Sequence, residues 1–275
     1  MQANNPIGVF DSGYGGLTVL KQLVKELPQY DFLYLGDNAR APYGNRSFDA
    51  VYQYTLQCVK WFFHQGCPLV VLACNTASAK ALRTIQQGYL AKINTDNRVL
   101  GVIRPTAEII GAFTTTNKIG ILGTTGTVQS NSYPIEIKKF FPQVDVFQQA
   151  CPLWVPLVEN NEFNEEGAEH FIKKDIDRLI SQSNDIDAIL LACTHYPLLI
   201  DKIRKFTPQH IEILSQGDII AASLTDYLHR HNEIDERCTK NASLSVYTTD
   251  SAEEFERQSI IFYGSPLPAK HVNID

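Results

Sequence analysis

The chain has 275 residues, of which 44% are hydrophobic and 20% charged, a composition with enough apolar side chains for one large or two modest cores. A net charge of −6 without any dense Lys/Arg run argues against a nucleic-acid partner, and no apolar stretch approaches the ~18 residues of a membrane span. Because the start also lacks the basic and apolar regions of a secretory signal, we expect a cytoplasmic protein that binds neither nucleic acid nor membrane.

The cysteines do not have the spacing of a zinc site. They are Cys58, Cys67, Cys74, Cys151, Cys193 and Cys238. No two of them form a Cys-x-x-Cys pair, so we predict no metal site and expect free thiols in a reducing compartment.

The first predicted strand ends in a glycine-rich turn. The pattern predicts a strand from Ile7 to Asp11, a tight turn from Ser12 to Gly16 and then a helix with one apolar face. Position 18 is Thr, so the turn lacks the Gly-x-Gly-x-x-Gly dinucleotide fingerprint, and no Gly-Lys-Ser/Thr follows as in a P-loop. The glycines either let backbone N–H groups approach an anion or only permit a tight turn, and the local sequence leaves both open.

Strands and helices then alternate. We expect, in order, a strand at Phe32 to Asp37, a loop from Asn38 to Asn45, a helix capped by Ser47 and ending by Gly66, the strand reaching Cys74, a helix from Ser78 to Tyr89 and a strand at Val99 to Ile103. Arg104 and Pro105 are expected to end that strand, at the crossing into a second lobe. This alternation is typical of a parallel sheet with helices on both faces.

The alternation continues to the end of the chain. Strands are predicted at Lys118 to Leu122, Val144 to Gln149, the run ending at Cys193, Ile211 to Leu214 and Leu244 to Thr248, and helices at Ser132 to Phe141, Glu165 to Ser181, Leu198 to Phe206 and Ile219 to His231. We therefore predict an α/β fold of two similar lobes, each a mostly parallel sheet flanked by helices, related by a pseudo-two-fold axis with the site in the cleft between them. Residues 1–98 plus 210–275 would form the first lobe, which carries Cys74, and residues 99–209 the second, which carries Cys193.

Two pairs of segments echo each other. Residues 69–74 (Leu-Val-Val-Leu-Ala-Cys) are matched 119 residues later by 188–193 (Ala-Ile-Leu-Leu-Ala-Cys), and residues 7–13 are matched 112 residues later by 119–125. The similar offsets indicate an internal repeat of two similar α/β halves, although short buried strands also resemble one another by composition.

The matched cysteines suggest a reaction. If both strands end at one cleft, a thiolate can take a proton from carbon while the opposite thiol returns one to the other face of the planar carbanion. Two close thiolates repel each other, so the pair should share one proton. Each thiol precedes a predicted helix N-terminus, which favours the thiolate, and Asp11 or His195 could relay protons. This pattern predicts racemisation or epimerisation by Cys74 and Cys193.

Each of these residues also has a purely structural interpretation. A cysteine at the end of a buried strand is most often a small core residue, and His195 could equally be a satisfied structural histidine. Asp11, Asp37 and Glu159 could be helix caps or solvated acids. The residues alone therefore indicate a cleft enzyme with a thiol, without identifying a substrate.

Five motifs follow one another in the chain. They are Asp11-Ser12-Gly13-Tyr14-Gly15-Gly16-Leu17, Tyr34-Leu35-Gly36-Asp37, Ala41-Pro42-Tyr43-Gly44, Cys74-Asn75-Thr76-Ala77 and Cys193-Thr194-His195-Tyr196-Pro197. As an ordered set they resemble the bacterial glutamate racemases of the aspartate/glutamate racemase superfamily. Residues 124–128 and 150–153 fit the same family, so the resemblance runs from residue 7 to at least residue 199.

The resemblance implies two α/β lobes and an enzyme, commonly a homodimer, that interconverts L- and D-glutamate without pyridoxal phosphate, another cofactor or a metal and supplies D-glutamate for peptidoglycan. It implies that Cys74 acts on the D-glutamate side, assisted by Asp11, and that Cys193 acts on the L-glutamate side, assisted by His195. Asp37 and Glu159 would be weaker catalytic candidates. The implied substrate-binding residues are Asp11, Ser12, Tyr43, Gly44, Asn75, Thr76, Thr194 and His195.

Two segments depart from the family pattern. Tyr14 stands where a small aliphatic residue is expected, and Ser215-Gln216-Gly217 replaces a segment of the Asp-Ser-Gly/Ala type. Neither touches the thiols, so we expect them to affect the cleft rather than the reaction. The chain also lacks the long N-terminal extension of precursor-regulated members, so activation by a cell-wall precursor is not expected.

Three other functions stay open. An aspartate racemase of the same superfamily generally carries an acid where His195 follows Cys193 and Thr194, so the histidine favours glutamate. A two-lobed amino-acid-binding protein would bind ligand without exchanging its α-hydrogen, and the missing export signal argues against its usual extracytoplasmic form. A thiol hydrolase would need an oxyanion hole and a thiol–imidazole pair, and it would have no use for a second matched thiol.

Overall fold

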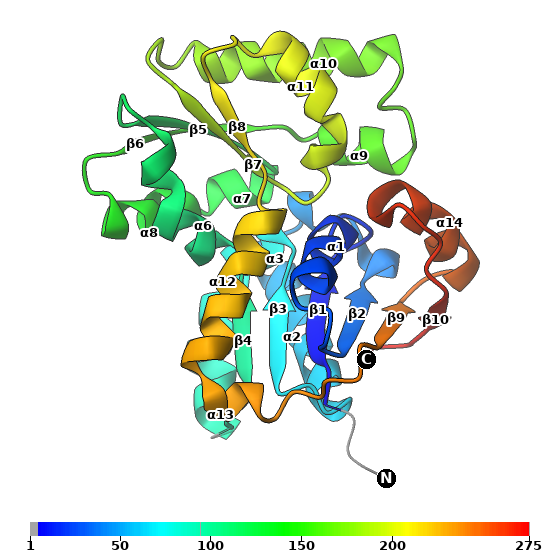
Figure 1. Cartoon of the computed structure of the whole chain (residues 1–275). Helices are drawn as coiled ribbons and strands as arrows, with labels where there is room; N and C mark the ends of the chain where they lie inside the picture. The colour runs from blue at the N-terminus through cyan, green and yellow to red at the C-terminus, as the bar shows by residue number, and fades with distance from the viewer. Residues whose placement is uncertain (1–4, 94, 275) are drawn as a thin grey trace.

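Two parallel sheets flanked by helices make up the computed structural model, which describes residues 5–93 and 95–274 (Figure 1). The larger sheet has the strand order β10-β9-β2-β1-β3-β4, and the smaller has the order β6-β5-β7-β8. The first sheet contains β1 (Ile7–Asp11), β2 (Phe32–Gly36), β3 (Leu69–Leu72), β4 (Arg98–Gly101), β9 (Leu244–Thr248) and β10 (Ala269–His271). The second contains β5 (Lys118–Gly123), β6 (Asp145–Ala150), β7 (Ala188–Ala192) and β8 (Glu212–Leu214). The predicted α/β class with two flanked parallel sheets is confirmed.

Helices cover the faces of both sheets (Figure 1). Around the first sheet lie α1 (Leu17–Glu26), α2 (Phe48–His64), α3 (Asn75–Lys80), α4 (Leu82–Thr84), α5 (Ala91–Ile93), α12 (Gly217–Arg230), α13 (Asn232–Asp235) and α14 (Ala252–Tyr263). Around the second lie α7 (Thr125–Gln129), α8 (Ser132–Phe140), α9 (Trp154–Glu159), α10 (Glu166–Ile180) and α11 (Ile200–Phe206). Helix α6 (Ile103–Ile109) packs against both α8 and α12, so it bridges the two lobes.

The same strand order recurs in the two lobes. Strands β2-β1-β3-β4 are arranged like β6-β5-β7-β8, with the second strand of each set beside the first and the third on the first strand's other side. Cys74 follows the third strand of one set and Cys193 follows the third strand of the other. The echoes in the sequence therefore correspond to equivalent strands, β1 with β5 and β3 with β7.

Sheet membership differs from the expected division at both crossings. Strand β4 pairs with β3 in the first sheet, although residues 99–209 were assigned to the second lobe. Strand β8 pairs with β7 in the second sheet, although residues 210–275 were assigned to the first lobe. Strands that follow each other in the chain usually lie next to each other, and β4 and β8 each join the sheet of the strand before them. The chain therefore passes from the first lobe to the second after Gly101 and returns after Leu214.

Two expected boundaries near these elements are also wrong. Arg104 and Pro105 do not mark the end of the strand, which ends earlier, at Gly101. They lie in the first turn of α6, where a proline costs no backbone hydrogen bond. The helix after Cys74 begins at Asn75 rather than at Ser78, because the Cys74 side chain itself caps it.

The six cysteines are all free thiols, and all are buried. In residues 5–93 and 95–274, no group of three or more His, Cys, Asp or Glu side chains is arranged to hold a metal ion. Over the same residues, none of the helices has the length and apolarity that crossing a bilayer requires.

Candidate active site between the lobes

A pocket lies between the lobes, where the carboxyl ends of β1 and β3 face those of β5 and β7. In each sheet these two strands flank the point where the strand order reverses, which is where open α/β sheets bind ligands. The pocket is lined by Ser12, Pro42, Tyr43, Gly44, Asn45, Cys74, Asn75, Thr76, Thr124, Cys151, Pro152, Val155, Pro156, Glu159, Cys193, Thr194 and His195. Both matched thiols therefore belong to one site.

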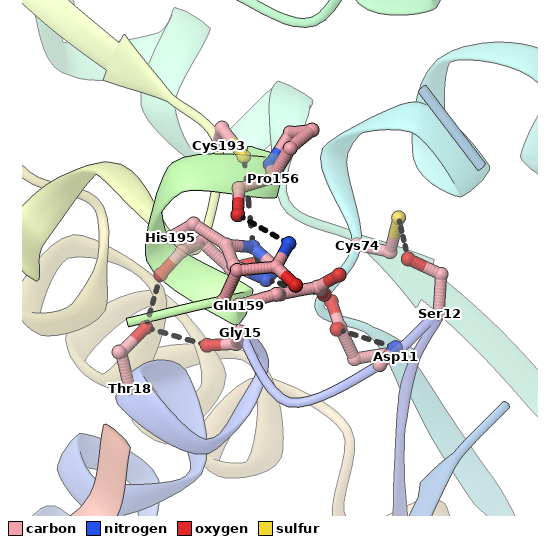
Figure 2. A network of polar contacts seen from close by, with 12 residues as sticks. Asp11, Ser12, Gly15, Thr18, Cys74, Pro156, Glu159, Cys193 and His195 are labelled. Atoms are coloured by element: carbon pink, nitrogen blue, oxygen red, sulfur yellow. Dashed lines mark hydrogen bonds and ion pairs between the residues drawn. The ribbon is translucent and has the colours of Figure 1, made fainter. Parts of the chain in front are cut away.

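Cys74 enters the pocket from the first lobe. Its side chain caps α3 by accepting a hydrogen bond from the Ala77 N–H at 3.4 Å, and its Sγ lies 3.5 Å from Ser12 Oγ (Figure 2). Burial, and after it the Asp11 carboxylate, raises the pKa of Cys74 to about 12. Both effects favour the protonated form of the Cys74 thiol.

Cys193 enters the same pocket from the second lobe. Its Sγ lies 3.9 Å from Nδ1 of His195, whose Nε2 lies 2.9 Å from Glu159 Oε1 (Figure 2). Burial lowers the pKa of His195, but the hydrogen bonds to Cys193 and Glu159 outweigh it and raise that pKa to about 10. His195 therefore links the Cys193 sulfur to the Glu159 carboxylate.

Asp11 lies next to the pocket rather than in its lining. It is fully buried at the end of β1, where its Oδ1 accepts a hydrogen bond from the Gly13 N–H at 3.0 Å. The hydroxyl of Thr194 donates to its Oδ2 at 3.4 Å from the other lobe. Burial raises the pKa of Asp11, while the charge of His195 opposes that rise. Asp11 thus lies between the two halves of the site.

The turn after β1 and the first residues of α1 hold the Cys193 loop in place. The Thr18 hydroxyl lies within hydrogen-bond distance of two carbonyl oxygens, that of Gly15 at 2.8 Å and that of Thr194 at 3.0 Å (Figure 2). A Cβ on Gly15 would collide with Thr194 Oγ1 and His195 Nδ1, so glycine is required for this close approach. The sequence left open whether these glycines bind an anion or only permit a tight turn. In the structure, Gly15 lies where the two lobes contact each other.

Of the residues implied to bind substrate, the structure brings all but Asp11 into the pocket lining. The weaker candidate Glu159 also lines it, but Asp37 does not. The Asp37 carboxylate accepts hydrogen bonds from Arg40 Nε at 2.7 Å, from Thr249 Oγ1 at 2.9 Å and from the Tyr43 hydroxyl. Asp37 therefore fixes the loop that carries Tyr43.

Several lining residues were not predicted from the sequence. Thr124 belongs to the second lobe, and its Oγ1 lies 2.9 Å from Thr76 Oγ1 of the first lobe. It follows Ser12 by 112 residues, which is the offset of the repeat. That offset could have identified it. Cys151 lies in the segment 150–153 that fits the family pattern, but nothing there marked it as a site residue. Val155 and Pro156 follow in α9, and the sequence gave no signal for them.

A family model described as Asp/Glu/hydantoin racemase matches residues 7–224. The chain belongs to this family. Within the racemase family, it is 37% identical to the glutamate racemase of Persephonella marina over 95% of this chain and 94% of that protein. Its fold matches crystal structures of two glutamate racemases over 99% of both chains: isoform RacE1 from Bacillus anthracis (TM-score 0.89, 32% identity) and the enzyme from Francisella tularensis in complex with D-glutamate (TM-score 0.86, 29% identity).

Proposed function

We propose that this chain is an isomerase that interconverts L- and D-glutamate, with Cys74 and Cys193 as its two proton-transfer groups. The observation that carries the proposal is that equivalent strands of two lobes deliver these thiols to one pocket. The curated relatives support glutamate as the substrate, and so does the D-glutamate bound to the Francisella tularensis racemase.

The protonation of the site suits a two-base reaction. In the L-to-D direction of the proposal, Cys193 starts as the thiolate with His195 beside it, and Cys74 starts as the thiol, the form that its raised pKa favours. Cys193 would then take the α-proton of L-glutamate, and Cys74 would donate its proton to the opposite face of the carbanion. The products are D-glutamate, a Cys193 thiol and a Cys74 thiolate, so each turnover leaves the enzyme in the form that the reverse reaction needs.

The polar groups of the pocket suit an amino-acid dicarboxylate. Ser12, Thr76 and Thr194 offer hydroxyl groups and Asn75 an amide, which can bind carboxylates locally in a chain whose net charge is −6. The proposal needs no cofactor or metal, because both proton-transfer groups belong to the chain. We also propose that the enzyme supplies D-glutamate for peptidoglycan. We propose a homodimer as well, and light scattering of the purified protein tests that oligomeric state.

The reaction is tested by proton NMR of L- and D-glutamate in deuterated water. We expect the wild type to exchange the α-hydrogen of both enantiomers and to invert both. Cys74→Ser should still exchange L-glutamate, and Cys193→Ser should still exchange D-glutamate, but neither variant should invert its substrate at more than a small fraction of the wild-type rate. Cys238→Ser, a buried cysteine outside the pocket lining, is the matched control and should behave as wild type.

Other results would support a different function. Binding of glutamate without α-hydrogen exchange by the wild type would favour an amino-acid-binding protein. Faster inversion of aspartate than of glutamate would favour an aspartate racemase.

A further inference from the structure

Gln216 lies at the centre of a buried polar cluster behind the pocket. It belongs to the Ser215-Gln216-Gly217 segment, where the chain crosses back from β8 to α12, and only 5% of it is exposed. Its neighbours in the cluster come from other elements: Asn75 of α3, the Val102 carbonyl at the first crossing, Thr106 of α6 and Tyr133 of α8. The cluster therefore joins both crossings to one residue of the pocket lining.

The contacts of Gln216 use both ends of its amide. Nε2 lies 3.2 Å from the Val102 carbonyl oxygen, 2.8 Å from Thr106 Oγ1 and 2.7 Å from the Tyr133 hydroxyl. Oε1 accepts a hydrogen bond from Asn75 Nδ2 at 2.8 Å. The Tyr133 hydroxyl donates in turn to Asn75 Oδ1 at 2.5 Å. Two amides and a phenol thus form a closed set of hydrogen bonds.

One backbone carbonyl sets the direction of every bond in this set. The Val102 oxygen can only accept, so the Gln216 NH2 group must face it and the Gln216 oxygen must face Asn75. Asn75 must then turn its NH2 group toward Gln216 and its oxygen toward Tyr133. Burial raises the pKa of Tyr133 well above its usual value, which keeps the hydroxyl a donor.

The fixed amide of Asn75 keeps donor capacity for a ligand. Asn75 lines the pocket and is 2% exposed. An Asn NH2 group has two hydrogens, and Gln216 is its one acceptor in the described part of the chain. The opposite orientation would present a carbonyl oxygen, which repels a carboxylate.

We propose that Gln216 is a positioning residue that holds Asn75 with its NH2 group available to a carboxylate of the substrate. The inference deepens the proposed function, because it takes glutamate as the ligand that Asn75 contacts. The Gln216 amide also contacts the Val102 carbonyl, at the first crossing. The orientation of Asn75 therefore depends on how the two crossings lie against each other.

The first test is a double-mutant cycle on KM. Gln216→Ala should raise KM for both enantiomers about tenfold, the equivalent of one hydrogen bond, and leave kcat within about twofold. Asn75→Ala should have a similar effect, and adding Gln216→Ala to it should raise KM no further, because the two residues act as one unit. Thr55→Val, which removes a buried hydroxyl of α2 that bonds the Val51 carbonyl, is the control and should leave KM unchanged. Unchanged KM in Gln216→Ala, or effects that multiply in the double variant, would overturn the proposal.

The variant Gln216→Glu adds a pH readout that a loss of packing would not produce. The carboxylate introduced by this change cannot donate to the Val102 carbonyl, whereas the protonated acid can, so the KM defect should shrink as pH falls. The ratio of KM between Gln216→Ala and wild type should stay constant over the same pH range. If the Gln216→Glu defect does not depend on pH, the orientation argument is wrong.

A measurement without substrate separates this inference from the proposed function. In nitrogen-15 spectra of the full chain, the Asn75 side-chain NH2 should give two resolved signals protected from solvent exchange, and Gln216→Ala should remove that protection. Unchanged signals would refute the positioning role. Failure of the wild type to racemise glutamate, with the Asn75 signals behaving as expected, would refute the proposed function instead.

Discussion

At the scale of single residues, the contacts of His195 with Cys193 and Glu159 give the site a pH-dependent stability. The folded-state pKa of His195 is about 10, against an ordinary value of 6.5, so the folded protein binds this proton more tightly than the unfolded chain does. The stabilisation is fully present below pH 6.5 and is lost as pH rises toward 10.

We therefore predict that His195→Asn lowers the free energy of unfolding most near pH 6.5 and by progressively less toward pH 10. Urea unfolding of wild type and variant across that range measures the difference. Glu159→Gln removes one of the two partners that raise the His195 pKa, so its loss of stability should follow the same pH trend and be smaller. A loss of stability that stays constant with pH would show that the charge of His195 does not contribute.

Sequence could predict some of these residues and not others. Cys74 and Cys193 were predictable because an apolar strand ending in a thiol occurs twice at a repeat offset. The pairing of His195 with Glu159 was not, because Glu159 lies on a separate helix and nothing in the pattern directs it toward β7. Gln216 was visible only as a departure from a family pattern, since its role depends on two chain crossings that meet in three dimensions.

At the scale of elements, Asp37 fixes the segment between β2 and α2 that supplies Tyr43 and Gly44 to the pocket. Its carboxylate is fully buried and is held by Arg40, Tyr43 and Thr249. The acid therefore holds the loop and lies outside the lining of the pocket.

We predict that Asp37→Asn raises KM for glutamate by about three- to tenfold, because the weakened loop shifts Tyr43 and Gly44. The pH–rate profile of the variant should keep the shape of the wild-type profile. Thr249→Val, which removes one of the three partners of Asp37, should have a smaller effect in the same direction. A change in the shape of the Asp37→Asn profile would instead give Asp37 a role in proton transfer.

Element boundaries show where sequence patterns reach their limit. The strands β3 and β7 were predicted because each is an uninterrupted apolar run, and β1 because it is apolar up to Asp11; all three are fully buried. The start of α3 was misplaced because its cap is a cysteine rather than one of the usual Ser, Thr, Asp or Asn residues. The sheets that β4 and β8 join depend on which neighbouring edge is open, and a single strand's sequence does not encode that.

At the scale of the whole molecule, the two lobes share buried apolar contacts. One cluster of buried side chains includes Val9 of β1 and Ile189 of β7, which belong to different sheets. The pocket is likewise lined from both sides. A continuous core and a shared site make the folding of each lobe depend on the other.

The two tryptophans of the chain can report on each lobe separately, because Trp61 lies in α2 and Trp154 in α9. In Trp61→Phe and Trp154→Phe variants that also carry Cys74→Ser to prevent turnover, we expect one urea transition, at the same midpoint by fluorescence and by circular dichroism. D-glutamate at about one hundred times its Kd should add about 2.7 kcal/mol to the free energy of unfolding in both reporters, since it binds only the folded site. A midpoint that shifts for only one tryptophan would mean that the ligand binds one lobe alone, which contradicts a site built from both.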